Sequence, residues 1–250
     1  MLNPTVFITG ATSGIGRATA LLLGNSGFRI IAAGRRQERL DELKSLLPAG
    51  QVHTITFDVR DKIAVKNAID SLPETWQQID ILINNAGNAH GLSAIQDGDL
   101  EDWDLMIDIN VKGLLYVSKA IMPQMIARKS GRIINIGSIA GKEVYPNGNV
   151  YSASKFAVDA LSQAMRIDLN KEGIMVSEIN PGMVETEFSE VRFKGDKNRA
   201  DATYKGFEPL RPEDIADIIL FMVTRPAHVN LADIIVLPAA QANTTITNRK

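Results

Sequence analysis

TVFITGATSGIG, residues 5–16, decides the fold of this chain: an apolar run passes through a glycine-rich turn into the start of a helical pattern. Glycine has no Cβ, so a phosphate oxygen can approach the backbone of such a turn, and the helix N-terminus supplies free N–H groups and positive potential. The spacing of Gly10, Gly14 and Gly16 is G-x-x-x-G-x-G, which differs from the G-x-G-x-x-G fingerprint. A purely structural turn is the alternative, but the strand and helix on either side favour a phosphate-binding turn.

Six further apolar runs alternate with helical patterns along the rest of the chain. They are rich in Ile and Val and most lack apolar/polar alternation, which is typical of parallel strands buried on both faces. We expect strands at Thr5–Thr9, Arg29–Ala33, Val52–Phe57, Ile79–Ile83, Arg132–Ile136, Ile174–Ile179 and Asp233–Leu237. We expect helices at Gly14–Asn25, Gln37–Leu47, Lys62–Ser71, Leu100–Ala127, Tyr151–Lys171 and Pro212–Thr224. The pattern predicts a single α/β domain over residues 1–250: a doubly wound Rossmann fold with a seven-stranded parallel sheet and helices on both faces.

One polar segment, Phe188–Phe207, departs from this alternation. A long irregular insertion in a compact domain is usually a functional lid or a disordered loop. We therefore expect a substrate lid at about residues 186–210. The last residues, Ala239–Lys250, are also polar and suit either a tail or an arm for subunit contacts.

Composition narrows the classes of function. The 250 residues are 45% hydrophobic with a formal net charge of −2, a globular balance that predicts no nucleic-acid or membrane partner. There is no cysteine, so disulfides, thiolate catalysis and cysteine–zinc sites are excluded, and we expect no metal site. The first sixteen residues carry no charge, unlike a signal peptide, and no apolar stretch is as long as a membrane span. We expect a cytoplasmic protein that acts on a small molecule.

The end of the second strand bears on the choice of dinucleotide. An NAD site places an acidic residue there to hold the ribose 2′-hydroxyl, whereas this chain reads Ala-Ala-Gly-Arg35-Arg36. Arg35, with Arg36 beside it, can offer a charge-assisted fork to a 2′-phosphate. The alternative is a solvated pair of arginines, but basic charge at a helix N-terminus opposes the helix dipole. The sequence therefore predicts NADP rather than NAD.

Two further strand ends carry candidate cofactor contacts. Asp58 and Val59 follow the third strand, where Asp58 can accept from an adenine amino group or, alternatively, cap the next helix. Asn85, Ala86 and Gly87 follow the fourth strand, at the edge where ligands of open α/β sheets collect.

The candidate chemistry lies in Ser138, Tyr151 and Lys155. Tyr151 and Lys155 are four residues apart, so a helix places both on one face. A neighbouring ammonium favours the phenolate and lowers a tyrosine pKa by roughly one to three units, so Tyr151 can exchange a proton near neutral pH. Ser138 follows a strand end and can hold a substrate oxygen by a hydrogen bond. The order of turn, serine and tyrosine–lysine pair indicates an oxidoreductase.

With these motifs the chain resembles the short-chain dehydrogenase/reductase family over nearly its whole length. The family's T-G-x-x-x-G-x-G turn matches residues 9–16, and its N-N-A-G motif matches residues 84–87. The resemblance implies that Asn110, Ser138, Tyr151 and Lys155 are the catalytic residues, with Asn110 supporting a water in the proton relay. It also implies a loop over the nicotinamide at Pro181, Gly182, Val184 and Thr186, and a homotetramer packed through Leu100–Ala127 and Tyr151–Lys171. The predicted cofactor contacts are Gly10, Thr12, Ser13, Gly14, Ile15, Gly16, Arg35, Arg36, Asp58, Val59, Asn85, Ala86, Gly87, Tyr151, Lys155, Pro181, Gly182, Val184 and Thr186.

Within the family, the chain is most similar to the NADP-dependent 3-hydroxy acid dehydrogenases, through residues 34–40 and 187–196. This subgroup includes enzymes acting on serine, allo-threonine and 3-hydroxypropionate and related sulfoacetaldehyde reductases. The resemblance implies hydride transfer between NADP(H) and a small 3-hydroxy acid or the matching semialdehyde or keto acid. Two alternatives stay open: a reductase of a bulkier ketone on the same fold, and a non-catalytic NADP-binding regulator. The chain has Val236-Leu237-Pro238-Ala239 where the wider family has V-D-G-G.

The predicted lid suggests a basis for substrate choice. We expect Ser138, Tyr151 and Arg192 to bind the substrate, with Arg192, helped by Lys194, pairing with a carboxylate or sulfonate. The alternative is a solvated loop whose charges pair with each other. His90 and Tyr145 are further candidates for the border of the pocket.

Overall fold

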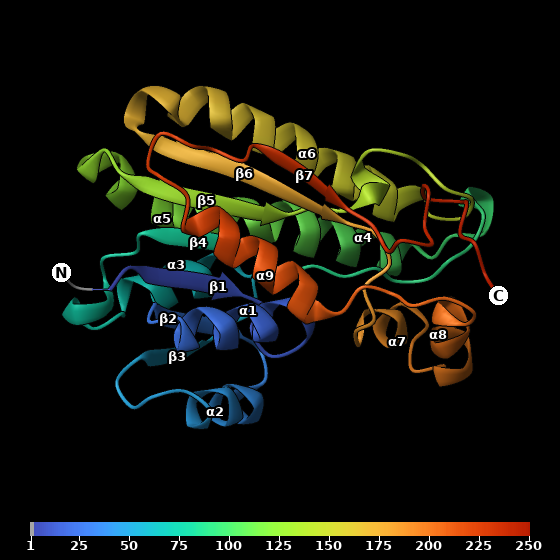
Figure 1. Cartoon of the computed structure of the whole chain (residues 1–250), viewed down its shortest axis with the longest axis horizontal. Coiled ribbons are helices and arrows are strands. Elements are labelled where there is room, and N and C mark those ends of the chain that lie inside the picture. Colours follow the sequence, from blue (N-terminus) through green and yellow to red (C-terminus); the bar gives the residue numbers. More distant parts are fainter. Residues whose placement is uncertain (1–2) are drawn as a thin grey trace.

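The seven apolar runs pair as parallel strands of one sheet in the computed structural model, which describes residues 3–250 (Figure 1). The strands run in the order β3-β2-β1-β4-β5-β6-β7, so the winding direction reverses between β1 and β4. Their bounds are β1 (Thr5–Thr9), β2 (Arg29–Gly34), β3 (Val52–Thr56), β4 (Ile81–Asn84), β5 (Gly131–Ile136), β6 (Ile174–Pro181) and β7 (Asp233–Val236). The predicted fold class is confirmed, and its reversal point is where open α/β sheets bind ligands.

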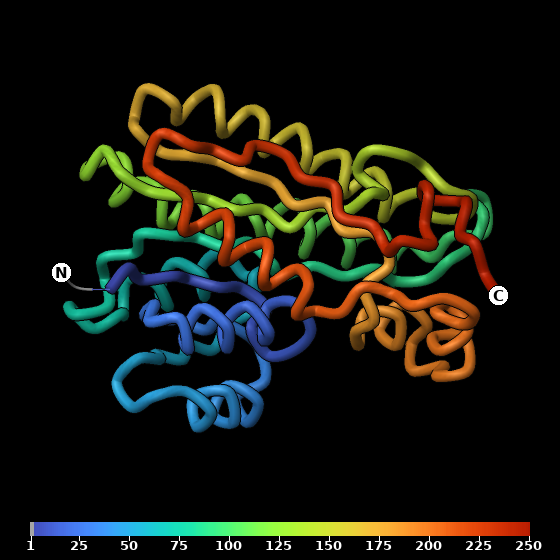
Figure 2. Tube along the Cα trace, in the orientation of Figure 1, coloured from blue at the N-terminus to red at the C-terminus, as the bar shows by residue number. Residues whose placement is uncertain are grey.

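Two apolar cores, one on each face of the sheet, hold the helices in place. On one face, alternate residues of β1 such as Val6 and Ile8 pack beneath α1 (Gly14–Asn25), α2 (Gln37–Ser45) and α9 (Pro212–Val223). On the other, Phe7 belongs to the core beneath α3 (Lys62–Asp70), α5 (Leu114–Arg128) and α6 (Asn149–Leu169). The tube view shows these two helical layers with the sheet between them (Figure 2). Short 3₁₀ turns complete the chain: η1 (Glu74–Trp76), η2 (Ile95–Asp97), η4 (Ile139–Gly141) and η5 (Asn170–Glu172).

The predicted continuous helix Leu100–Ala127 is wrong in one respect. The structure has α4 (Leu100–Ile107), a π-helical turn η3 (Asp108–Gly113) and then α5. The wider turn carries Asn110, whose side chain is bonded twice to the backbone of Asn88, with both donor–acceptor distances 2.8 Å. Such π turns are often found at functional sites, and a hydrophobic period cannot register one extra residue in a turn.

The polar segment 186–210 contains two short helices, α7 (Phe188–Arg192) and α8 (Lys197–Tyr204), at the carboxyl ends of the strands (Figure 1). The backbone N–H of Gly91 donates to the carbonyl of Arg192 at 3.0 Å, which fastens α7 to the loop after β4. The C-terminal residues fold back on the same segment, since the N–H of Lys250 donates to the carbonyl of Gly206 at 2.8 Å. Within residues 3–250, no helix combines the length and apolarity needed to cross a bilayer.

Candidate active site

A cavity of about 620 Å³ lies at the carboxyl ends of the strands, at the reversal point between β1 and β4. Its wall is formed by the glycine turn, the arginines after β2, the loop after β4, the serine after β5 and the tyrosine–lysine pair of α6. The predicted site residues in the wall are Gly10, Thr12, Ser13, Gly14, Ile15, Arg35, Arg36, Asp58, Val59, Asn85, Ala86, Gly87, Ser138, Tyr151, Lys155, Pro181, Gly182, Val184, Thr186 and Arg192. Gly16 and Asn110 lie behind the wall.

The glycine turn is shaped by close packing. Gly10 and Gly14 have φ of +67° and +50°, a region that side-chain-bearing residues rarely adopt. Gly16 faces the loop after β4, where a Cβ would come within 2.4 Å of Nδ2 of Asn85. The Oγ1 of Thr9 accepts from the N–H groups of Asn85 and Ala86 at 3.0 and 2.9 Å and so ties this loop to β1. Gly16 therefore contributes by packing, while Gly10 and Gly14 lie in the cavity wall.

The turn fits the phosphates of a dinucleotide. It leads into the N-terminus of α1, whose first turn has no acidic residue, so its N–H groups and dipole suit an anion. Next to it, the Nη2 of Arg36 donates to Thr12 Oγ1 at 3.1 Å, and its Nη1 pairs with Glu187 at 3.0 Å. The side chain of Arg35 is 63% exposed and lies 3.8 Å from Asp58. This basic edge of the cavity fits a 2′-phosphate, with Arg35 the more available of the two arginines.

Asp58 lines the cavity but does not cap a helix, so that alternative is wrong. The N-cap of α3 is Asp61, which accepts from the N–H groups of Ile63 and Ala64 at 2.9 and 3.0 Å. Asp58 pairs with Arg60, with the shortest distance 2.7 Å. Burial opposes ionisation of Asp58, but the hydrogen bonds and charge of Arg60 outweigh it and lower the pKa of this carboxyl. The sequence offers two aspartates three residues apart, and only the geometry separates their roles.

The serine and lysine are held by the end of β5. Ser138 N-caps η4, its Oγ accepting from the N–H of Ala140 at 3.1 Å. Lys155 is buried on α6 and its Nζ donates to the carbonyl of Ile136 at 2.9 Å. Burial lowers the pKa of Lys155 to about 8, against the opposing charge of Glu178. The ammonium lies 6.0 Å from the ring centroid of Tyr151, on the same face of the helix as predicted.

The expected effect of Lys155 on the tyrosine is wrong. Burial raises the pKa of Tyr151 above its ordinary value of 10, and the groups that oppose this rise are Arg192 and Ser138. Desolvation penalises the phenolate more than these neighbours favour it. Tyr151 is therefore a neutral proton donor at pH 7 in this structure, which suits reduction of a carbonyl; its use as a base improves as pH rises.

Asn110 lies behind the cavity wall and is 2% exposed. Besides its two bonds to Asn88, its Nδ2 donates to Ser154 Oγ at 2.9 Å, one residue before Lys155. The side chain thus ties the η3 turn to both the loop after β4 and α6. These contacts give Asn110 a place next to the tyrosine–lysine helix; they leave its water-supporting role a proposal.

Arg192 projects from α7 over the chemical end of the cavity. Its guanidinium carbon lies 4.9 Å from the ring centroid of Tyr151 and 5.2 Å from that of Phe188. Nη2 donates to the Tyr145 hydroxyl at 2.7 Å, and Nε is buried without a hydrogen-bond partner within residues 3–250. A guanidinium in the wall of a cavity suits a ligand with an acidic oxygen.

The structure places the other candidate pocket residues, Lys194, Tyr145 and His90, in different surroundings. Lys194 does not help Arg192, because its Nζ pairs with Asp102 at 3.0 Å and with Asp99 at 3.4 Å. Tyr145 lines the main cavity, whereas His90 lines a small neighbouring one.

Several cavity residues had no signal in the sequence. Phe188 packs edge-to-face against Tyr151 with ring centroids 5.6 Å apart. From the C-terminal segment, Gln241, Thr244, Thr245, Thr247 and Arg249 also line the cavity. A polar tail carries no periodic pattern, so only its folded position reveals this contribution. In residues 3–250, no group of three or more His, Asp or Glu side chains is arranged to hold a metal ion.

Comparisons with known proteins identify similar chains and structures. The family model described as short chain dehydrogenase matches residues 4–197. Sulfoacetaldehyde reductase 2 of Chromohalobacter salexigens is 45% identical over 243 residues, covering 96% of each chain. The NADP-dependent 3-hydroxy acid dehydrogenase YdfG of Salmonella typhi is 45% identical over 238 residues, 95% of this chain and 96% of the relative. The closed form of serine dehydrogenase complexed with NADP+ superposes with a TM-score of 0.94 and 42% identity, covering 98% of this chain and 99% of that one.

Proposed function

Starting from the fact that this chain belongs to the short-chain dehydrogenase family of oxidoreductases, we propose that it transfers a hydride between NADP(H) and a small 3-hydroxy acid, or the matching semialdehyde or keto acid. The single observation that carries the substrate class is the guanidinium of Arg192, which lines the cavity with its carbon 4.9 Å from the ring centroid of Tyr151. A reductase of bulky neutral ketones has no use for such a group. A non-catalytic regulator does not belong with these relatives or require Tyr151.

The cofactor fits the cavity in one direction. Its phosphates suit the glycine turn before α1, and its 2′-phosphate suits Arg35 and Arg36. Pro181 at the end of β6, Gly182 and Thr186 border the chemical end. When bound, the nicotinamide supplies or accepts the hydride.

The chain's own residues supply the proton and the orientation. The Ser138 hydroxyl holds the substrate oxygen, and the Tyr151 phenol gives it a proton during reduction and takes one during oxidation. Lys155, held by the Ile136 carbonyl at 2.9 Å, keeps its ammonium next to the ring. Because burial raises the pKa of Tyr151, oxidation speeds up as pH rises towards the tyrosine's pKa.

In this proposal the carboxylate or sulfonate of the substrate binds Arg192. The guanidinium is fixed by Tyr145 on one side and by aromatic rings on the other, so a bidentate acid is oriented relative to the phenol. Arg192 belongs to α7, so binding of the acid also fastens the lid segment over the reacting atoms.

The test compares substrates of equal size with and without an acid. Arg192→Ala should lower kcat/KM by about 10²-fold or more for a 3-hydroxy acid and its semialdehyde, since a charge-assisted bidentate pair is lost. For a neutral alcohol or aldehyde of similar size the change should be far smaller. Steady-state assays with NADP(H) and with NAD(H) measure both the substrate and the cofactor preference.

Lys194→Ala is the matched control, because Lys194 is a cation of the same loop that pairs with Asp99 and Asp102 instead of lining the cavity. It should leave the discrimination between acid and neutral substrates unchanged. Equal losses on acid and neutral substrates in Arg192→Ala would remove the assigned role.

The remaining properties belong to the same proposal. We place the protein in the cytoplasm, since a chain without cysteine needs no oxidising compartment. We also assign it a homotetramer packed through α4, α5 and α6. The substrate lid at about 186–210 and the water-supporting role of Asn110 complete the assignment.

A further inference from the structure

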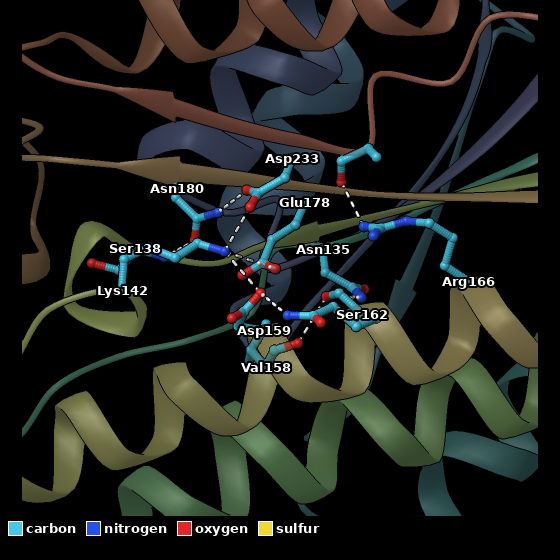
Figure 3. Close-up of polar contacts among 12 residues, drawn as sticks. Asn135, Ser138, Lys142, Val158, Asp159, Ser162, Arg166, Glu178, Asn180 and Asp233 are labelled. Carbon is cyan, nitrogen blue, oxygen red and sulfur yellow. Dashed lines mark hydrogen bonds and ion pairs between the residues drawn. The ribbon is translucent and has the colours of Figure 1, made fainter.

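Behind the catalytic serine lies a charged cluster that the mechanism above does not use (Figure 3). It joins Lys142, just after η4, to Asp159 of α6, Glu178 of β6 and Asp233 of β7. The Nζ of Lys142 lies 2.8 Å from Asp159 and from Asp233, and 4.0 Å from Glu178. One ammonium therefore faces three carboxyl groups, which leaves an excess of acid in a mostly buried place.

Glu178 is the carboxyl of this cluster for which ionisation is least favourable. It is 1% exposed, and its Oε1 has no hydrogen-bond partner among the described residues. Burial of a charged carboxylate without a hydrogen-bond partner costs free energy, and the carboxyl group avoids this cost by keeping its proton. Burial raises the pKa of Glu178 to about 7; the Lys142 ammonium opposes the rise, and the charge and hydrogen bond of Asp159 add to it.

The cluster reaches the catalytic serine through an asparagine. Asn180 of β6 is fully buried, and its Oδ1 accepts from the backbone N–H of Ser138 at 3.0 Å. Its Nδ2 donates to Asp233 at 2.7 Å. Both ends of this amide are used, so the position of the Ser138 backbone is tied to a carboxylate of the cluster.

A second connection runs through Gly137. A Cβ there would lie 2.2 Å from Oε1 of Glu178, so the carboxyl packs against this Cα. Gly137 lies between Ser138 and Ile136, and the carbonyl of Ile136 accepts from the buried ammonium of Lys155. The carboxyl of Glu178 thus packs behind the segment that bears Ser138 and whose Ile136 carbonyl holds Lys155.

We propose that Glu178 is a positioning residue which, by keeping its own proton, fixes the Gly137 peptide behind Ser138 and sets the charge next to Lys155. The catalytic half of this proposal rests on the proposed function; the proton-holding half does not. Neither Glu178 nor Asp159 lines the cavity.

The titration of Glu178 has a defined direction. The charged groups that face it are Lys142 beyond η4, Asp159 and Lys155 of α6, and Asp233 of β7. When Glu178 loses its proton, its negative charge favours the ammonium of Lys155 and so raises the pKa of that lysine. A neutral residue at position 178 therefore makes Lys155 lose its proton at lower pH.

Stability of the cofactor-free protein gives the first test. The folded pKa of Glu178 lies above its ordinary value of 4.5, so its stabilising contribution is full below pH 4.5 and is lost as pH rises through about 7. Glu178→Gln stays neutral throughout. The Tm of Glu178→Gln minus that of the wild type should thus increase by at least about 2 °C between pH 5 and 8. Asp168→Asn, an exposed acid on α6, is the matched control and should give a constant difference.

Turnover gives the second test. For carbonyl reduction, kcat is lost at high pH. In Glu178→Gln the midpoint of this loss should move down by about half a pH unit, as expected for removal of one nearby charge, with KM little changed. Glu178→Asp, which can ionise again, should restore the wild-type limb. Parallel Tm curves together with superimposed pH profiles for wild type and Glu178→Gln would overturn the proposal.

A measurement on the wild type covers the case in which the variants do not fold. Among residues 3–250, Glu178 is the one carboxyl with an upward net shift of its pKa, so infrared spectra should show one protonated carboxyl band that disappears with a midpoint near pH 7. Absence of this band at pH 6 would also end the idea. Tm and infrared readings need no substrate, so they stay decisive even if no hydroxy acid is turned over, a result that would contradict the proposed function alone.

Discussion

At Tyr151 two opposing effects act on one phenol. Its enclosure disfavours the phenolate, while Arg192 and Ser138 favour it, and the balance raises the pKa of the ring hydroxyl. Lys155 does not enter this balance, since burial lowers its pKa to about 8 and the lysine loses its proton before the phenol of Tyr151 ionises. A lysine four residues away therefore predicts proximity but not the electrostatic balance, which depends on how much of each group the fold buries.

Removal of the phenolic hydroxyl tests its role as proton donor. Tyr151→Phe should lower kcat by about 10²- to 10⁴-fold, the usual contribution of general acid–base catalysis, and leave the affinity for NADPH nearly intact. Stopped-flow absorbance and NADPH fluorescence titration measure the two quantities.

Tyr145→Phe is the matched control for Tyr151→Phe. It removes a hydroxyl that accepts from Arg192 at 2.7 Å, so kcat should stay within about tenfold of the wild type. Full activity of Tyr151→Phe would contradict the assigned proton transfer.

The strands illustrate what a sequence can predict at the scale of elements. The inner strands, such as β1, are short apolar runs buried on both faces, so composition identifies them and only the ends shift slightly. The edge strands β3 and β7 are only partly buried. The sequence does not predict the π turn at Asn110 or the pairing of Lys194 with Asp102. Both depend on contacts between residues far apart in the chain, which no local period or charge pattern records.

A similar long-range contact joins the lid segment to the arginines after β2. Glu187, directly before α7, pairs with Arg36 at 3.0 Å and also with Arg39. All three side chains are more than a third exposed, so the contact is worth at most about 1 kcal/mol and can be exchanged for another anion. In the proposed binding mode, a 2′-phosphate would compete with Glu187 for Arg36.

Neutralising this carboxylate should favour the phosphorylated cofactor. In Glu187→Gln the Kd for NADP should fall by about two- to fivefold, the equivalent of a partly exposed charge pair, while the Kd for NAD stays unchanged. Isothermal titration with both cofactors measures this. Glu185→Gln, two residues earlier and exposed, is the control that should change neither constant. Weaker NADP binding in Glu187→Gln would mean that Glu187 orients Arg36 for the phosphate instead of competing with it.

At the scale of the whole molecule, the cavity draws on segments from both halves of the chain and from its C-terminal tail. The tail is fastened by Arg249, whose guanidinium donates to the carbonyls of Lys205 and Thr203. The segment 186–210, the tail and the edge of the sheet thus form one wall of the cavity. Sequence motifs predict the part of this wall that contains Ser138, Tyr151 and Lys155, but they do not predict the contribution of the tail.

The proposed tetramer predicts a change in mass when its helical surface is altered. Leu115 of α5 and Phe156 of α6 are 37% and 40% exposed, large apolar side chains on the two helices that the family resemblance places between subunits. An aspartate in a packed apolar interface leaves a buried, unpaired charge. Phe156→Asp should therefore convert particles of four 27.3 kDa chains into smaller ones, as measured by light scattering after gel filtration. Leu46→Asp, an exposed apolar position just after α2, should leave the mass unchanged. A monomeric wild type, or an unchanged mass in Phe156→Asp, would place the subunit contacts elsewhere or remove them.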